Sequence, residues 1–271
     1  MTTALAPAQI EACARLIAQA YADNAILERF PAELSPKSLA DAIAIQDRVC
    51  AILRWKTVGW KVGSARPEVR KRLGEIAPVT GRLFEGAIMR SPASLPRSQV
   101  HHPMFEGELA AVMGRDLPPR AGAYSVEEVL DAIDTVLPVI EFADIRSREG
   151  EGVTAYELTA LNGGSFRLIV GEPIAGWRSL DLQALKAEMR LDGKVAANEF
   201  SGDKRSDFVW VMHFLANRLS QRGIGLRAGE YVATGVILDY FDIEETREAA
   251  FQVEGAPAVV LEVRREVESV R

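Results

Sequence analysis

The amino-acid sequence predicts an α+β protein, in which a helical N-terminal lobe leans on a β-rich body. Apolar residues recur at helical spacing in the N-terminal part, whereas runs typical of strands dominate the remainder of the chain. Because helices come first and strands follow, this order favours α+β over an alternating βαβ wind. The 271 residues contain no internal repeat and no linker rich in Pro, Gly or Ser. We therefore expect a lobe over residues 1–75 and a body over residues 76–271, which together form one cooperative unit.

The predicted lobe begins with two amphipathic helices. The first starts near Pro7, a residue suited to a first helical turn, and the second follows Ser38 and continues to Leu53. Residues 57–63, TVGWKVG, are β-branched and aromatic with flanking glycines, which predicts a strand. A short basic helix is expected over residues 66–74.

The predicted body consists mainly of strands. Strand-like runs occupy residues 79–86, 101–114, 138–145, 165–171, 231–241 and 250–263. Ser125 and Glu128 form a capping box, which predicts the start of a helix. Asp192-Gly193 lies between two alternating runs and predicts a hairpin turn. Residues 207–222 carry apolar residues along one helical face, so a further amphipathic helix is expected there.

Composition and charge exclude several classes of protein. The formal net charge is −6, whereas a nucleic-acid-binding protein usually presents a basic face. No run approaches the roughly 18 consecutive apolar residues of a membrane helix, and the N-terminus lacks the blocks of a secretory signal. We expect a cytoplasmic protein with a small-molecule partner, no nucleic acid and no membrane. Cys13 and Cys50 lie at apolar helical positions, which favours buried thiols over a disulfide or a nucleophile.

Acidic residues in two predicted strands are the main functional signal. Motifs for phosphate binding, serine hydrolysis and structural zinc are absent from the sequence. Glu106 and Glu108 are two residues apart on a strand, so their side chains share one face, which either meets water at a sheet edge or binds a ligand. Glu141 lies mid-strand among apolar neighbours, with Arg146 or Arg148 as alternative partners. A hard divalent cation, Mg²⁺ or Mn²⁺, would satisfy all three carboxylates, which are costly to bury unpaired.

Lys61 is a charged residue in the middle of the apolar strand over residues 57–63. Residue type alone favours a side chain that reaches the surface along its alkyl stem, and the alternative is an anion partner. A 2-oxo acid chelates a divalent cation, and the polarised carbonyl then stabilises an enolate. Near such a substrate, Lys61 would bind the carboxylate or move protons.

Seven segments, taken in order and spacing, resemble the 2-oxopent-4-enoate hydratase and 4-oxalocrotonate decarboxylase family of the fumarylacetoacetate hydrolase superfamily. The resemblance covers nearly the whole chain and depends on the ordered set, since no single segment is decisive. The segments are GWKVG (59–63), PVTGRLF (78–84), FEGELAAVMGRDL (105–117), VLPVIEFADIR (136–146), LNGGSFRLIVG (161–171), LANRL (215–219) and LRAGEYVATG (226–235).

The resemblance implies a mixed β-roll body with an N-terminal helical cap, a Mg²⁺ or Mn²⁺ cofactor, and a short unsaturated 2-oxo acid as substrate. The chain departs from the family pattern at several positions: Leu161 replaces the usual Asp, and Gly164 replaces the usual Ser. Val79 and Thr80 stand where an acidic residue is common, and the helix near Asp207 lacks the usual Gly-x-Pro entrance. The metal ligands are therefore kept, while part of the substrate-binding shell has changed. The expected site consists of the metal ligands Glu106, Glu108 and Glu141, the catalytic Lys61, and the substrate-binding residues Arg82, Asn162 and Thr234.

The activity implied by the resemblance is hydration of a 2-hydroxy-2,4-dienoate, ketonised in the site, to a 4-hydroxy-2-oxo acid during meta-cleavage catabolism of aromatic compounds. Two alternatives break a C–C bond instead: decarboxylation of a 2-oxo-3-enedioate and hydrolysis of an acylpyruvate. A third alternative is a non-catalytic subunit that stabilises an enzyme partner. We also expect a homo-oligomer.

Overall fold

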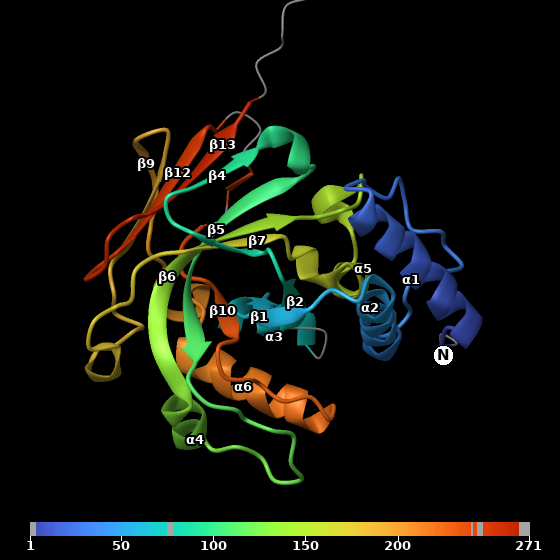
Figure 1. Cartoon of the computed structure of the whole chain (residues 1–271), viewed down its shortest axis with the longest axis horizontal. Helices are drawn as coiled ribbons and strands as arrows, with labels where there is room; N and C mark the ends of the chain where they lie inside the picture. The colour runs from blue at the N-terminus through green and yellow to red at the C-terminus, as the bar shows by residue number, and fades with distance from the viewer. Residues whose placement is uncertain (1–3, 75–77, 240, 243–245, 266–271) are drawn as a thin grey trace, which may run out of the picture.

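The structure is a computed structural model that describes residues 4–74, 78–239, 241–242 and 246–265. Helices α1, α2 and α5 gather on one side of the molecule (Figure 1). The described helices are α1 (Pro7–Ala22), α2 (Leu39–Leu53), α3 (Pro67–Leu73), α4 (Val126–Asp131), α5 (Ala155–Ala160) and α6 (Phe208–Gln221). The described strands are β1 (Thr57–Gly63), β2 (Val79–Phe84), β3 (Ile88–Arg90), β4 (Ala93–Pro96), β5 (Pro103–Met113), β6 (Ile133–Asp144), β7 (Arg167–Val170), β8 (Ala187–Leu191), β9 (Lys194–Asn198), β10 (Tyr231–Val236), β11 (Phe241–Asp242), β12 (Glu248–Val253) and β13 (Val259–Arg264).

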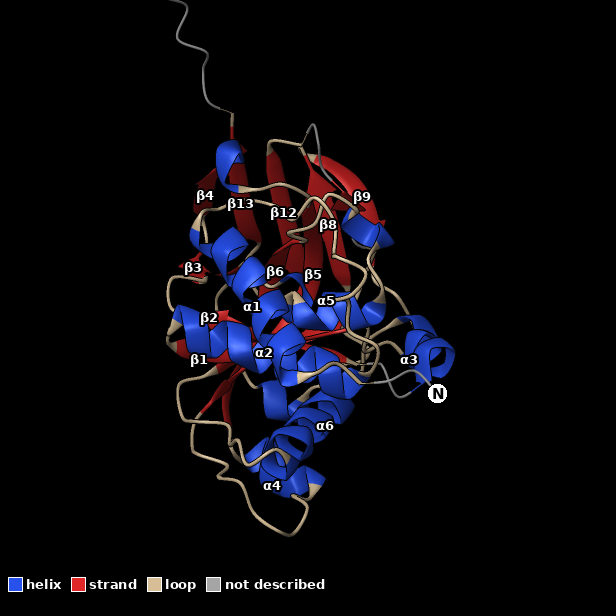
Figure 2. Cartoon of the chain, turned by 90° about the vertical axis from the view of Figure 1, so that its right-hand side faces the viewer, coloured by secondary structure: helices blue, strands red, loops and turns tan. Residues whose placement is uncertain are grey.

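Two β-sheets form the body, and helices lie in front of them when the molecule is viewed from the side of the lobe (Figure 2). The larger sheet has the order β2-β1-β10-β5-β6-β7-β3, with β11 paired to β5. It is mixed, because β1 runs parallel to β10 and β3 parallel to β7, while β5 and β6 are antiparallel. The smaller sheet has the order β4-β13-β12-β8-β9. This architecture is the α+β fold with mixed, curled sheets that the sequence predicts.

The two faces of the larger sheet bury different sets of residues. Side chains alternate along a strand, so Trp60 and Phe105 face the main hydrophobic core, which also fills the space beneath the smaller sheet. Leu83, Ala110 and Val139 belong to a smaller apolar cluster on the opposite face. Lys61 and the three glutamates share the parity of this second set in the strand registers. The curled sheet therefore encloses charged groups on its less extensive apolar face.

A separate apolar cluster holds the lobe together and joins it to the body. Cys13 and Ile17 of α1 pack with Ile45 of α2, and the same cluster includes Leu161. Gln46 of α2 is fully buried and donates hydrogen bonds to the carbonyls of Thr80 at 2.7 Å and Thr159 at 3.0 Å. The lobe is thus fixed to β2 and α5 by buried hydrogen bonds as well as by apolar contact.

The local signals at element ends agree with the structure. Ser38 accepts a hydrogen bond from the backbone N–H of Asp41 at the start of α2. Ser125 and Glu128 make the reciprocal bonds of a capping box at α4. Asp192 and Gly193 both adopt positive φ, 47° and 78°, in the turn between β8 and β9. None of the described helices is long and apolar enough to cross a membrane.

Strand β1 lies inside the range expected for the lobe, yet it is hydrogen bonded between β2 and β10 in the larger sheet. Residues 57–63 therefore pack with the body. The expected boundary between residues 75 and 76 falls outside the described residues, as does Tyr240 of the expected strand over residues 231–241. The sequence did not predict β3 or β4, because elements this short show no clear periodicity. Helix α5 was also not predicted, although Thr154 and Glu157 form a capping box at its start.

Candidate active site

Three carboxylates from two neighbouring strands meet on one face of the larger sheet. Glu106 of β5 is paired in register with Glu141 of β6, and Glu108 lies two residues further along β5 on the same face. One carboxylate oxygen of each residue lies within 4.8 Å of the others. Glu108 and Glu141 are 0% and 1% exposed, whereas Glu106 is half-buried. The face that carries Glu106 and Glu108 is therefore largely closed to water.

Lys61 of β1 joins this cluster. Its Nζ lies 2.9 Å from Oε1 of Glu141. Burial alone lowers the pKa of Lys61, but the charges of Glu141 and Glu106 and a hydrogen bond to Glu141 outweigh burial, so the pKa lies above its ordinary value. The expectation that Lys61 reaches the surface is wrong, because the curl of the sheet brings a carboxylate from a distant strand to it. The alternative partners for Glu141 are also wrong: Arg146 lies 3.8 Å from Asp144, and Arg148 pairs with Glu28.

The electrostatics of the cluster fit a divalent cation. Three carboxylates and one ammonium group carry a formal charge of −3 + 1 = −2 when all are ionised. Burial, reinforced by Glu141 and Glu106, raises the pKa of Glu108 well above its ordinary value. Oε1 of Glu108 and Oε2 of Glu141 are buried without a hydrogen-bond partner. Unpartnered carboxylate oxygens in a buried, net-negative cluster are the donor set that Mg²⁺ or Mn²⁺ prefers.

A backbone N–H orients one of these carboxylates. Gly235, at the end of β10, donates to Oε2 of Glu108 at 2.8 Å. Its φ is +87°, and a Cβ atom there would lie 2.6 Å from Oγ of Ser206. Only glycine meets both conditions without strain. The Thr-Gly segment of β10 thus shapes the cluster through its glycine.

A tight turn covers the alkyl stem of Lys61. Asn162, Gly163 and Gly164 have φ values of +56°, +66° and +69°. A Cβ atom at Gly163 would lie 3.4 Å from Cδ and Cε of Lys61, and one at Gly81 would lie 2.2 Å from the carbonyl oxygen of Asn162. Gly163 and Gly81 therefore let the backbone of the turn approach Lys61 closely. Gly164, in the same turn, replaces the usual Ser of the family pattern.

Two of the expected substrate-binding side chains make buried hydrogen bonds within the protein. Oδ1 of Asn162 accepts from the backbone N–H of Arg82 at 2.7 Å, and Nδ2 donates to the carbonyl of Arg82 at 2.8 Å. Oγ1 of Thr234 donates to the carbonyl of Leu109 at 2.7 Å. Both side chains are 1% exposed. They hold the strands and the turn around Lys61 in place.

The structure does not bring the guanidinium of Arg82 to the acidic cluster. Arg82 pairs in register with Trp60, not with Lys61, so its side chain leaves the opposite face of the sheet. There its Cζ lies 4.6 Å from the ring centroid of Trp60, and Nη2 lies 3.0 Å from Oδ1 of Asp47. The substrate contact expected of Arg82 thus conflicts with the alternation of side chains along β2.

A cavity of about 190 Å³ opens onto Glu106 and Glu108. Since one water occupies about 30 Å³ of liquid volume, the space suits a molecule of a few heavy atoms. Ser64, Arg66 and Arg72 also line it, from the segment that follows β1 and from α3. These residues were not predicted as part of the site, although the basic helix directly after the strand of Lys61 is a signal that could have indicated them.

The cysteines do not add a nucleophile to this site. Burial raises the pKa of Cys13 to about 12 and that of Cys50 to about 11, so both remain thiols at neutral pH. Cys13 is buried, Cys50 is half-buried, and both are free of disulfides. Cys13 is thus the buried thiol that was expected, whereas Cys50 is less buried than expected.

The fold and the site together define a β-roll protein with a carboxylate cluster suited to a divalent metal. Residues 73–265 match the family model described as fumarylacetoacetate (FAA) hydrolase C-terminal, so the chain belongs to the fumarylacetoacetate hydrolase family.

The chain is similar in sequence to 2-keto-4-pentenoate hydratases and to 4-oxalocrotonate decarboxylases. The chain is 26% identical over 204 residues to a 2-keto-4-pentenoate hydratase of Burkholderia vietnamiensis (strain G4 / LMG 22486), which covers 75% of this chain and 77% of the relative. It is 28% identical over 182 residues to a 4-oxalocrotonate decarboxylase of Pseudomonas sp. (strain CF600), which covers 67% and 68%. These similarities confirm the family predicted from the sequence.

Solved structures confirm the fold. The 4-oxalocrotonate decarboxylase from Pseudomonas putida G7, complexed with magnesium and adipate, superposes with a TM-score of 0.85 at 23% identity, over 97% of this chain and 100% of that chain. The fumarylpyruvate hydrolase from Pseudomonas aeruginosa, in complex with Mn²⁺ and pyruvate, gives a TM-score of 0.56 at 15% identity, over 76% and 89%. Because the superposition with the decarboxylase covers 97% of this chain, it includes the helical lobe.

Proposed function

We propose that this protein is a divalent-metal-dependent hydratase, which adds water to a short 2-hydroxy-2,4-dienoate to give a 4-hydroxy-2-oxo acid. The observation that carries the proposal is the buried cluster of Glu106, Glu108 and Glu141 beside Lys61, next to a cavity of about 190 Å³. The similarity to 2-keto-4-pentenoate hydratases supports a short unsaturated 2-oxo acid as the substrate class.

Glu106, Glu108 and Glu141 would hold Mg²⁺ or Mn²⁺. A 2-oxo acid would chelate the bound cation, whose charge would stabilise the enolate. The backbone N–H of Gly235 fixes one carboxylate oxygen of Glu108, which reduces the reorganisation of this side chain needed on metal binding.

Lys61 would neutralise negative charge or donate a proton in the same site. Its ammonium form is favoured by the neighbouring carboxylates, so it carries a proton at neutral pH. A buried ammonium beside the substrate neutralises developing negative charge or donates its proton to carbon. The turn over residues 162–164 and Gly81 keep the alkyl stem of Lys61 in place against the sheet.

The reaction needs no external oxidant or reductant. The enol proton moves to carbon 5 during ketonisation, which leaves a double bond between carbons 3 and 4. The hydroxyl group of water then bonds to carbon 4, and the other proton of that water goes to carbon 3. The protein must therefore position one water and transfer protons, and both tasks favour a small cavity with few competing waters.

Decarboxylation of a 2-oxo-3-enedioate is a second candidate, favoured by Arg66 and Arg72 in the cavity that contains Glu106. Guanidinium groups bind carboxylates through charge-assisted hydrogen bonds, so they suit a substrate with a second carboxylate. The similarity to 4-oxalocrotonate decarboxylases supports the same candidate.

Product analysis tests these functions. The metal-loaded protein is incubated with mono- and dicarboxylic 2-hydroxydienoates, loss of the conjugated chromophore is followed, and products are identified by mass. A 4-hydroxy-2-oxo acid supports the hydratase, release of CO₂ marks the decarboxylase, and two acids mark an acylpyruvate-type hydrolase. Tight metal binding without turnover, together with co-purification of a homologous enzyme, would contradict catalysis and identify a non-catalytic subunit.

The homo-oligomeric state and the cytoplasmic location stay predictions. Light scattering coupled to size-exclusion chromatography measures the mass in solution, and a mass of one chain would contradict the first of them.

A further inference from the structure

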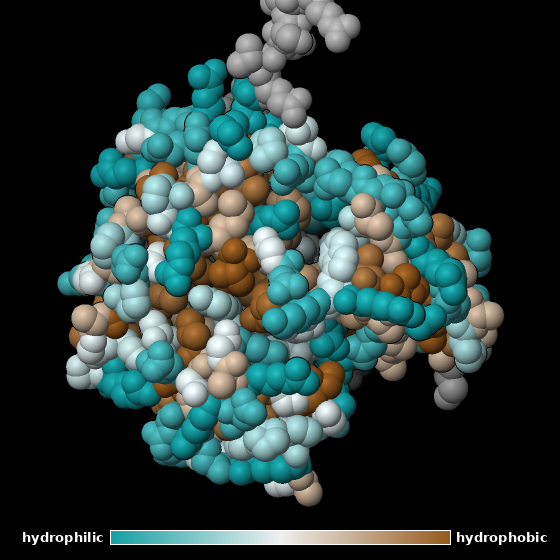
Figure 3. Space-filling model, viewed as in Figure 1, coloured by the Kyte–Doolittle hydropathy of each residue, from teal (hydrophilic) through white to brown (hydrophobic). Residues whose placement is uncertain are grey.

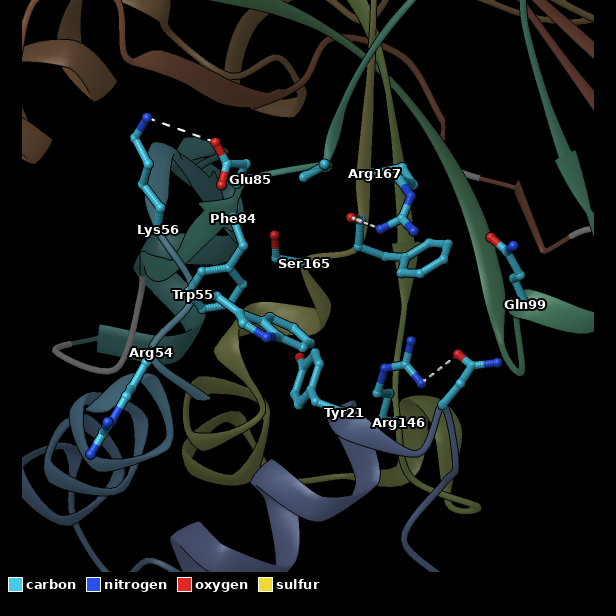
Figure 4. A pocket seen from close by; sticks show the side chains of 14 residues that line it. Tyr21, Arg54, Trp55, Lys56, Phe84, Glu85, Gln99, Arg146, Ser165 and Arg167 are labelled. Atoms are coloured by element: carbon cyan, nitrogen blue, oxygen red, sulfur yellow. Dashed lines mark hydrogen bonds and ion pairs between the residues drawn. The ribbon is translucent and has the colours of Figure 1, made fainter. Parts of the chain in front are cut away.

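A second cavity, of about 620 Å³, lies where the helical lobe meets the body. It shares no lining residue with the cavity at Glu106. Its walls come from the ends of α1, α2 and β2 and from the segment that leads into β7 (Figure 4). The molecular outline is indented between the body and the lobe (Figure 3).

Two guanidinium groups face this cavity from one side (Figure 4). Arg146 is 3% exposed, and its Nε is buried without a hydrogen-bond partner. Its Nη1 donates to Oδ1 of Asn24 at 3.0 Å, and its Nη2 lies 3.8 Å from Asp144. Its Cζ also lies 5.1 Å from the ring centroid of Tyr21 and 5.5 Å from that of Phe166. Arg146 is thus held by its neighbours, and it contributes positive charge to this wall of the cavity.

Arg167 is the second of these groups. Its Nη1 donates to the carbonyl of Phe166 at 3.1 Å, and no carboxylate within the described ranges forms an ion pair with it. Burial lowers the pKa of Arg167, and the positive charge of Arg146 lowers it further. The two cations therefore repel each other, and an anion bound at Arg167 would relieve that repulsion.

Aromatic rings form the opposite wall. Trp55 is 42% exposed, and its ring makes edge-to-face contacts with Tyr21 and Phe84, at centroid distances of 6.2 Å and 5.4 Å. Figure 4 shows Trp55 and Phe84 across the cavity from Arg167, while Tyr21 lies next to Arg146, whose Cζ is 5.1 Å from the Tyr21 ring centroid. An open indole face held by two neighbouring rings suits a planar, conjugated group.

The remaining charges leave this arrangement intact. Lys56 and Glu85 lie at one edge of the cavity, where Nζ and Oε1 are 3.8 Å apart and neutralise each other. The guanidinium of Arg54 points away from Trp55 (Figure 4). Asp144 is the one carboxylate beside the two arginines among the ion pairs of the described residues. The interior of the cavity thus keeps a net positive charge.

We propose that this cavity binds a small planar carboxylate, with its carboxylate group on the guanidinium of Arg167, near the charge of Arg146, and its conjugated part against Trp55 and Phe84. The volume lies within the roughly 300–1,000 Å³ of small-molecule pockets. An aromatic acid and a linear dienoate share this chemistry. Ser165 lines the cavity and directly follows the turn that covers Lys61, so a bound acid contacts the segment bordering the acidic cluster.

Calorimetric titration of the metal-free protein tests this proposal, because removal of metal prevents chelation at the glutamates. The probes are benzoate, the linear dienoate sorbate, cyclohexanecarboxylate and benzyl alcohol. We expect benzoate or sorbate to bind at one site per chain. Benzyl alcohol should not bind, because it lacks the charge, and cyclohexanecarboxylate should bind more weakly, because it lacks the flat face. Tighter binding of benzoate would identify the ligand class as an aromatic acid, and tighter binding of sorbate would identify it as a linear dienoate.

Variants then locate the binding site. Arg167→Gln should weaken binding by about tenfold or more, since it removes a charge-assisted pair, and Trp55→Leu should weaken it to a smaller extent. Arg178→Gln is the matched control, because the Arg178 guanidinium lies 4.3 Å from an aromatic centroid, as that of Arg167 lies 4.1 Å from Phe166. We expect less than about a twofold change for this control.

Absence of binding by both benzoate and sorbate would overturn the proposal. So would unchanged affinity in Arg167→Gln when melting temperatures show that the variant is folded, or equal binding of cyclohexanecarboxylate. The readout is binding and not turnover, so the outcome does not depend on the proposed hydratase activity.

Discussion

Nζ of Lys61 lies 2.9 Å from Oε1 of Glu141, and the two side chains are 5% and 1% exposed. The residues belong to β1 and β6, which are not neighbours in the larger sheet, since β10 and β5 lie between them. The pair therefore crosses the interior of the curled sheet and joins two strands that share no backbone hydrogen bonds.

Replacement of Lys61 should separate metal binding from turnover. Lys61→Met leaves Glu141 buried and unpaired, which should reduce the stability of the metal-free protein by about 3 kcal/mol. The cluster then carries one more negative charge, so Mg²⁺ affinity should be kept or rise, while kcat falls by about 100-fold or more. Lys56→Met is the control, because Lys56 is 71% exposed and its replacement should leave stability, Mg²⁺ affinity and kcat unchanged. Calorimetry measures stability and metal affinity, and steady-state kinetics measure kcat. Loss of metal binding in Lys61→Met would contradict the proposed role.

Neutralisation of the buried carboxylates should remove the metal. Glu108→Gln and Glu141→Gln each delete one charge and one anionic ligand, so Mn²⁺ affinity should fall by at least about 100-fold, with loss of activity. Glu85→Gln serves as the control, since Glu85 is 70% exposed and outside the cluster. Mn²⁺ titration followed by electron paramagnetic resonance measures the affinity. Unchanged Mn²⁺ binding in both cluster variants would place the metal elsewhere.

The benefit of metal for stability should grow with pH. In the metal-free protein, burial together with Glu141 and Glu106 raises the pKa of Glu108 above the 4.5 expected for an unfolded chain. The folded state then holds a proton that the unfolded state releases, so the free energy of unfolding falls as pH rises above that value. Bound Mg²⁺ displaces the proton, and the melting-temperature difference between metal-loaded and metal-free protein should be larger at about pH 7 than at about pH 5.

Scanning calorimetry at the two pH values measures this difference. Titrations in buffers of different ionisation enthalpy report the released proton directly. A melting-temperature difference that is the same at both pH values in the unmodified protein, with no proton released on Mg²⁺ binding, is the result that contradicts this prediction.

A pair of glycine substitutions should separate backbone strain from local crowding. Gly86 and Gly235 have nearly equal φ, +85° and +87°, but a Cβ atom at Gly86 meets nothing within 4 Å. Gly86→Ala should cost about 1–2 kcal/mol from φ alone. Gly235→Ala should cost at least about 1 kcal/mol more, because Ser206 and Val62 must move. It should also weaken metal binding through Glu108, as Gly86→Ala should not. Equal stability and equal metal affinity in the two variants would show that Gly235 has no special role.

The acidic cluster could be found from the sequence because each carboxylate stands out locally. Glu106 and Glu108 obey the two-residue period of a strand, and Glu141 interrupts an apolar run. The registers that bring them together were not needed to recognise them. Lys61 was also noticed, but its partner depends on the curl of a mixed sheet, which no local pattern contains.

Other features depended on long-range arrangement and could not be predicted. The face on which Arg82 lies follows from its pairing with Trp60, and the cavity between the lobe and the body needs residues from both. Helix α5 is different, because its capping box of Thr154 and Glu157 is a local signal that could have predicted its start. Local periodicity predicts elements, whereas register and packing decide which side chains meet.

The parallel pairing of β1 with β10 has a consequence for synthesis of the protein. β10 supplies both the edge on which β1 pairs and the N–H that orients Glu108. A ribosome-bound chain that has not yet emerged through Val236 lacks this strand, although its lobe helices can already form. The acidic cluster is therefore completed late in translation, and prematurely terminated chains carry the glutamates without the N–H that orients Glu108.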